Sequence, residues 1–148
     1  MPGSYLLDVN VLVALFDQAH IHHVAAHAWF EKVGETGWNS CPITENGFLR
    51  ILSHSGYPNS PTPIIDLAER LEELKKSAQN YEFWNDDYSS SRWIVEKRPQ
   101  VRSTQSTDAY LLNLCHRKKG ILATFDQRIK PALIGEATPS LLEYIPVL

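Results

Sequence analysis

The fold can be worked out from Tyr5–Asp17, which has the sequence YLLDVNVLVALFD. Apolar runs on both sides enclose Asp8, and a buried charge of this kind is normally paired, metal-bound or protonated. We expect Leu6 and Leu7 to end a buried parallel strand and Val9–Phe16 to open a helix. Asp8 would then lie at the carboxyl end of a strand, where open α/β sheets bind ligands. Alternatively, Asp8 simply caps the helix, and this stretch alone does not decide between the two.

Length and composition indicate a globular chain organised as one domain, residues 1–148. A chain of 148 residues is long enough to bury a substantial core without disulfides or a structural metal. Hydrophobic residues make up 43% of the chain and charged residues 21%, which are ordinary proportions for a globular protein. The formal net charge of −3 does not point to a nucleic-acid partner. It excludes none, because a local basic rim can lie beside catalytic acids.

Three features of the sequence indicate a cytoplasmic protein. The two cysteines, Cys41 and Cys115, lie among apolar residues and fit buried thiols in a reducing compartment better than a disulfide. The N-terminal sequence MPGSYLLD has no basic region followed by an apolar stretch, which argues against a secretory signal. No apolar run approaches the length of a membrane span, so we expect no membrane partner.

Strand and helix signals alternate along the chain. The apolar pattern predicts short strands at residues 5–7, 36–41, 81–84, 121–125 and 141–145. It predicts helices at residues 9–16, 22–33, 44–52, 64–76, 91–97 and 107–119. Because helices separate most of the strands, the order predicts an α/β fold. Its sheet would be mostly parallel, with four or five strands and helices on both faces.

Four acids occupy equivalent places in these predicted elements. Asp8 and Asp126 follow strands, whereas Glu45 and Asp108 begin helices. In a doubly wound sheet, the carboxyl ends of the strands and the N-termini of the helices that follow them lie along one edge. We therefore expect the four carboxylates to converge on one cleft. Taken singly, each acid is more simply explained as a helix cap or a turn residue.

Carboxylates that converge in this way need compensation. Two like charges about 4 Å apart repel by roughly 4 kcal/mol at a surface-like dielectric, and a helix N-terminus offsets only about 0.3–1 kcal/mol. Either protons are retained or a cation lies among the acids. Ligands that are all oxygen suit Mg²⁺ or Mn²⁺. Such a site activates water and neutralises phosphoryl charge, which indicates hydrolysis of a phosphodiester or a phosphate ester.

The segments around these acids form four blocks that follow one another along the chain. They are LLDVNVL (6–12), TENGFLR (44–50), TDAYLL (107–112) and LATFD (122–126). In this order they resemble the signature blocks of PIN-domain ribonucleases. The likeness is greatest to the VapC toxins of bacterial toxin–antitoxin systems, which HIHHVAAHAW (20–29) also resembles. No single block is specific, but the four together are.

The resemblance implies a PIN-like, three-layer α/β/α fold and a site in which the acids are catalytic and bind Mg²⁺ or Mn²⁺. The matching acids are Asp8, Glu45, Asp108 and Asp126. Asn10 matches a small polar residue that hydrogen-bonds within the site, and Thr124 matches the polar residue before the last acid. The implied reaction is endonucleolytic hydrolysis of RNA, leaving a 5′-phosphate and a 3′-hydroxyl. One departure is Arg128, which stands where many relatives carry a further acid and puts a second metal in doubt.

Partners follow partly from the resemblance and partly from the basic residues. VapC-like proteins act on RNA, are silenced by a cognate VapB-like antitoxin and form homodimers, so the resemblance implies these partners. Four arginines are candidate RNA contacts, namely Arg50, Arg92, Arg98 and Arg102. A solvated basic loop explains the last three equally well, and a surface salt bridge is the simpler explanation of the first.

Two other functions stay open on the sequence. The first is a Mg²⁺-dependent phosphatase with Asp8 as its nucleophile, which would need a second acid near position 10, where the chain has Asn10. The second is a non-catalytic RNA- or protein-binding module with a retired site. The intact set of four acids counts against the second alternative.

Overall fold

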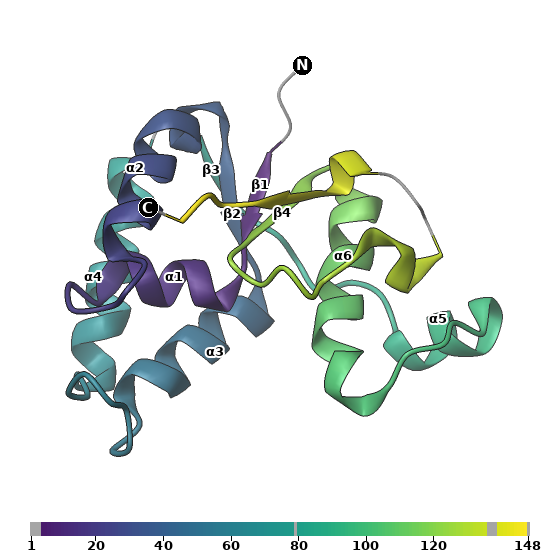
Figure 1. The fold of residues 1–148 in the computed structure, drawn as a ribbon, viewed down its shortest axis with the longest axis horizontal. Coiled ribbons are helices and arrows are strands. Elements are labelled where there is room, and N and C mark those ends of the chain that lie inside the picture. The colour runs from purple at the N-terminus through teal and green to yellow at the C-terminus, as the bar shows by residue number, and fades with distance from the viewer. Residues whose placement is uncertain (1–3, 79, 136–138, 148) are drawn as a thin grey trace.

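The computed structural model describes residues 4–78, 80–135 and 139–147 (Figure 1). The strands are β1 (Tyr5–Leu7), β2 (Trp38–Ser40), β3 (Tyr81–Phe83), β4 (Ile121–Thr124) and β5 (Leu142–Tyr144). The α-helices are α1 (Val9–Phe16), α2 (His23–Val33), α3 (Pro42–Ser53), α4 (Ile64–Ser77), α5 (Ser90–Lys97) and α6 (Ser106–Lys118). Residues 1–3, part of the stretch in which we expect no secretory signal, lie outside the described residues. No helix within the described ranges combines the length and the apolar character needed to cross a membrane.

The five strands form one sheet in the order β3-β2-β1-β4-β5, and every neighbouring pair is parallel. The predicted α/β fold with a mostly parallel sheet is confirmed. From β1 the chain moves outward to β2 and β3 on one side and then returns to β4 and β5 on the other. The direction of winding therefore reverses between β1 and β4, and this is where open α/β sheets place their ligands.

Helices cover both faces of the sheet, as Figure 1 shows with α1 to α4 on one side and α6 and α5 on the other. The alternation of side chains along β1 explains the two layers, because successive strand residues point to opposite faces. Tyr5 and Leu7 pack into the core beneath α1 to α4, whereas Leu6 packs into the core beneath α6. The three-layer α/β/α arrangement is confirmed.

The main difference from the predicted boundaries is at the start of α3. The pattern predicts a helix from residue 44, but α3 begins at Pro42. Proline at the first helical position loses no hydrogen bond, because the N–H it lacks would have no partner there. The backbone N–H of Cys41 is satisfied instead by Thr44 Oγ1, at 3.0 Å. As a result, Glu45 lies in the first turn of the helix rather than at its first residues.

Candidate active site

Asp8 follows β1 directly and caps α1. Its backbone is extended, with φ −61° and ψ 158°, and its Oδ1 accepts a hydrogen bond from Val9 N at 2.8 Å. Asp8 therefore matches both descriptions that the sequence leaves open, since it follows the end of a strand and also caps a helix. Its other carboxylate oxygen accepts from the hydroxyl of Thr124, at the end of β4, at 2.8 Å. Asp8 is only 7% exposed, so the cap lies inside the protein, at the junction of β1 and β4.

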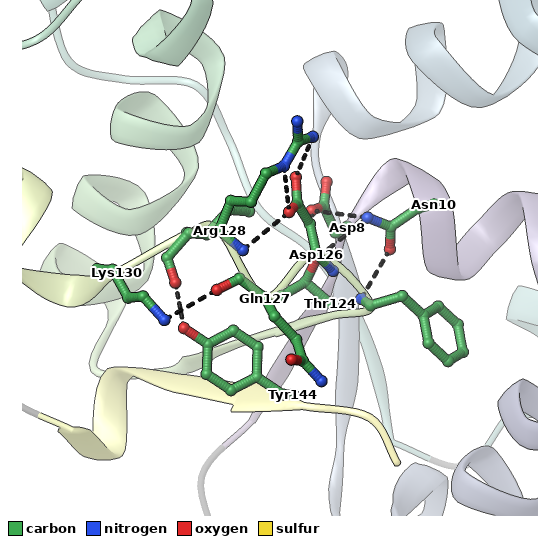
Figure 2. A network of polar contacts seen from close by, with 10 residues as sticks. Asp8, Asn10, Thr124, Asp126, Gln127, Arg128, Lys130 and Tyr144 are labelled. Atoms are coloured by element: carbon green, nitrogen blue, oxygen red, sulfur yellow. Dashed lines mark hydrogen bonds and ion pairs between the residues drawn. The ribbon is translucent and has the colours of Figure 1, made fainter. Parts of the chain in front are cut away.

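Asn10 and Thr124 tie the start of α1 to the end of β4, as Figure 2 shows. The side-chain amide of Asn10 donates to Thr124 Oγ1 at 3.1 Å, and its carbonyl accepts from Phe125 N at 3.1 Å. The hydroxyl of Thr124 also accepts from Asp126 N at 3.0 Å. These bonds fix the chain on both sides of Asp8. The two polar residues that the sequence singles out thus hold the acids in place through hydrogen bonds.

The environment of Asp8 disfavours its charge. Burial raises the pKa of this carboxyl to about 6, and the nearby charges of Asp108 and Asp126 add to the rise. The hydrogen-bond donors that face it are neutral, namely Val9 N, Asn10 Nδ2 and the Thr124 hydroxyl. Asp8 is therefore a buried carboxylate that the fold supports with dipoles but does not neutralise.

Asp126 lies two residues after the end of β4, and its charge environment is the opposite of that of Asp8. Arg128 donates to both of its carboxylate oxygens, from Nε at 2.9 Å and from Nη2 at 3.0 Å, and also donates its backbone N–H at 3.0 Å (Figure 2). The guanidinium holds the pKa of Asp126 below its usual range. Arg128 itself is exposed, with 91% of its side chain accessible.

Asp108 lies in the first turn of α6, next to Asp126. Burial raises its pKa, and the Asp126 charge raises it further. Both acids line a pocket of about 420 Å³, together with Arg102, Arg128 and Lys130. Since the charges of Asp108 and Asp126 both act on Asp8, the three carboxylates form one electrostatic group.

Glu45 is engaged elsewhere. Its Oε2 accepts from Lys75 Nζ of α4 at 2.8 Å and from the Tyr81 hydroxyl of β3 at 3.3 Å, and it also contacts the Ser40 hydroxyl. The structure therefore places Glu45 at the carboxyl end of β2, as expected, but with its carboxylate paired to α4. Asp8, Asp108 and Asp126 act on one another electrostatically, whereas Glu45 is paired with Lys75 of α4.

The donor set suits a hard divalent cation in chemistry but not in its present arrangement. The side chains are carboxylates, amides and hydroxyls, which are the oxygen ligands that Mg²⁺ and Mn²⁺ prefer. Among the described residues, however, no three Asp, Glu, His or Cys side chains stand close enough to hold one metal ion. The carboxylate of Asp126 is paired with Arg128, and that of Glu45 is paired with Lys75.

The sequence of this chain is similar to those of known proteins. The family model described as "PIN domain" matches residues 5–132. The chain belongs to the PIN-domain family. Ribonuclease VapC44 of Mycobacterium tuberculosis is 42% identical over 136 residues, which cover 90% of this chain and 93% of the relative. Ribonucleases VapC39 and VapC38 of the same organism are 37% and 38% identical, covering 95% and 82% of this chain and 98% and 84% of their own lengths. The resemblance to the VapC branch is confirmed.

Two features of this PIN domain were missed in the sequence. Lys75 lies in the predicted helix 64–76, and its ammonium contacts Glu45, 30 positions away in the chain. Nothing local could have shown this, because the contact depends on how α4 packs beside α3. The pairing of Arg128 with Asp126 has a local signal, since residues two apart on either side of a turn can meet.

The four candidate RNA-contacting arginines do not share one position. Arg102 lines the pocket with Asp108 and Asp126. Arg50 lies on α3, Arg92 lies on α5, and Arg98 caps the C-terminal end of α5. All four are exposed. By position, Arg102 is the strongest candidate for a phosphate contact beside the acids.

Proposed function

We propose that this PIN domain is a metal-dependent endoribonuclease that hydrolyses RNA phosphodiester bonds, and that it is the toxin of a VapBC-type toxin–antitoxin system. The observation that carries the proposal is the setting of Asp8. A buried carboxylate with neutral donors faces two further acids at the junction of β1 and β4, in a chain whose relatives are named ribonucleases. A charge of this kind favours a cation partner.

The residues divide the chemistry among them. A Mg²⁺ or Mn²⁺ ion bound here would supply a Lewis acid for the phosphoryl group and lower the pKa of a water molecule. Asp8, Asp108 and Asp126 would hold it, with Glu45 as a fourth ligand once released from Lys75. Asp8 or Asp108 would orient or deprotonate the attacking water in the metal-bound site.

The substrate and partners are part of the same proposal. The pocket beside the acids carries the cations Arg102, Arg128 and Lys130, which suit the phosphates of an RNA strand. A cognate VapB-like antitoxin would silence the enzyme. The enzyme would form a homodimer, and the enzyme and its antitoxin would be cytoplasmic. A small upstream reading frame that encodes a DNA-binding protein would support the antitoxin assignment.

An RNA cleavage assay tests the proposal directly. End-labelled RNA is incubated with the wild type and with Asp8→Asn, in Mg²⁺, in Mn²⁺ and in EDTA. We expect cleavage only by the wild type with metal, giving 5′-phosphate and 3′-hydroxyl ends. Cleavage in EDTA, or full activity of Asp8→Asn, contradicts the proposal. Phosphate release from p-nitrophenyl phosphate without RNA cleavage would favour the phosphatase, and RNA binding without cleavage would favour the binding module.

A further inference from the structure

Arg128 is bound to Asp126 by more contacts than an ordinary surface ion pair. Two guanidinium donors reach the two carboxylate oxygens, and the backbone N–H of Arg128 reaches Oδ1 as well. A bidentate pair of this kind is specific in geometry, because the planar fork of arginine matches a carboxylate. The positive charge also acts on Asp108, whose pKa it lowers against the rise caused by burial and by Asp126.

Lys130, another cation that lines this pocket, has different partners. Lys130 donates to the backbone carbonyl of Gln127 at 2.9 Å and lies over the ring of Tyr144 at 5.4 Å. Figure 2 shows Lys130 and Tyr144 on one side of the turn and the Arg128–Asp126 pair on the other. Arg128 and Lys130 thus carry the same charge in the same pocket, but of the two it is Arg128 that pairs with an acid of the site.

We infer that Arg128 is an internal counter-ion of the active site, which occupies Asp126 until a divalent cation competes for that carboxylate. The inference rests on the proposed metal-dependent function. With 91% of its side chain exposed, Arg128 can leave Asp126 without disturbing the core. An exposed ion pair changes an equilibrium constant by only a few-fold, so Arg128 would weaken metal binding only slightly. Arg128 would therefore not prevent metal binding, but it would raise the metal concentration that is needed to occupy the site.

Calorimetric titration with Mn²⁺ alone tests this role without any activity measurement. In the wild type, Mn²⁺ has to displace the guanidinium of Arg128 from Asp126, whereas in Arg128→Gln no guanidinium competes and only the backbone N–H still donates to the carboxylate. We expect Arg128→Gln to bind Mn²⁺ about two- to fivefold more tightly than the wild type. Lys130→Gln is the matched control, since it removes one positive charge from the same pocket and leaves the ion pair intact. Its affinity should differ from that of the wild type by less than about twofold.

The outcomes separate the inference from the function on which it rests. If Arg128→Gln and Lys130→Gln bind Mn²⁺ equally well, general electrostatics explains the effect and the role of Arg128 is wrong. If the wild type and both variants bind no Mn²⁺, the metal-dependent function itself is wrong. Both variants change exposed side chains, and thermal melting checks that each remains folded.

Nuclear magnetic resonance provides a second readout on Arg128 itself. In the metal-free protein its Nε–H is held by Asp126, so its cross-peak is expected to be resolved, and Arg128→Gln assigns it by its disappearance. We expect addition of Mg²⁺ to shift or broaden this cross-peak along the same binding curve that reports the metal. A cross-peak that stays unchanged at saturating Mg²⁺ would show that Arg128 remains on Asp126, and the inference would fail.

Discussion

Asp8 and Asp126 follow neighbouring parallel strands, yet their electrostatic settings are opposite. Asp8 is buried and meets neutral donors, and its pKa is raised to about 6. Asp126 is half-buried and meets Arg128, which lowers its pKa. One hydroxyl, that of Thr124, joins the two by donating to Asp8 and accepting from Asp126 N. The fold therefore neutralises one of two acids that it places side by side.

The difference shows which carboxylate has no cation beside it in the metal-free protein. A buried carboxylate without a cation destabilises a fold, so its presence indicates a function that needs it. The charge of Asp126 is balanced by an exposed arginine, whereas the described donors to Asp8 are all neutral. Asp8 would then be the carboxylate that lacks a cation whenever the metal is absent. Asp126 would be a metal ligand that exchanges Arg128 for the metal ion.

The largest effect is expected from removing either carboxylate. Asp8→Asn and Asp126→Asn should each reduce metal-dependent RNA cleavage on the order of 10³-fold, because each removes a metal ligand and several kcal/mol of transition-state stabilisation. Initial rates on a labelled RNA measure the loss. The variants should differ in metal-free stability at pH 7.5, since only Asp126→Asn gives up an ion pair. A variant that keeps more than a tenth of the activity would remove that acid from the site.

Thr124→Val should have the next largest effect. The hydroxyl of Thr124 donates to Asp8 and accepts from Asn10 and Asp126 N, so valine leaves these groups without their shared partner. We expect a 10- to 100-fold loss of cleavage rate, as for other groups that orient metal ligands. Steady-state kinetics in Mn²⁺ measures it.

Thr44→Val is the matched control for that loss. Thr44 is equally buried, and its hydroxyl bonds to the backbone of Cys41 at the start of α3. We expect this variant to lose comparable stability, about 1–3 kcal/mol, but to keep its cleavage rate within about threefold. If both variants lose activity in proportion to stability, the bond from Thr124 to Asp8 has no special role.

The pH dependence of stability tests the raised pKa of Asp8. The carboxyl titrates near 3.8 in the unfolded chain and near 6 in the folded protein, so the folded state binds more protons between these values. The contribution of Asp8 to stability is therefore greatest below pH 4, falls as the pH rises towards 6, and is constant above. The loss should be about 3 kcal/mol. Urea unfolding in EDTA at pH 4 and pH 7.5 measures it as the difference between wild type and Asp8→Asn, and a pH-independent difference would contradict the prediction.

Much of this comparison could be predicted from the sequence. The apolar runs around Asp8 and before Asp126 predict two buried strands, and parallel strands necessarily end at one edge of the sheet. The positions of both acids follow from that rule. Their opposite charge environments do not, because burial depends on how α1 and α6 pack over the sheet.

The counter-ions are the part that sequence reasoning could not supply. Lys75 reaches Glu45 only because α4 packs beside α3, and helix packing angles are not encoded in any local pattern. Arg128 is close to Asp126 in sequence, but an exposed arginine after a strand has many partners open to it. A local pattern can therefore place an acid at a sheet edge without showing which cation pairs with it.

The smallest effect is expected from substituting Arg102, and it is an effect on RNA affinity that can be measured without cleavage. Arg102 lines the pocket with Asp108 and Asp126, whereas Arg50 lies on α3 and is not among the residues that line it. Fluorescence anisotropy with a single-stranded RNA in EDTA avoids cleavage. Arg102→Gln should weaken binding about fivefold and lower the salt slope by about 0.7, the loss of one phosphate contact on a single strand. Arg50→Gln carries the same charge change, so an equal loss in both variants would mean that net charge, not the pocket beside Asp126, attracts the RNA.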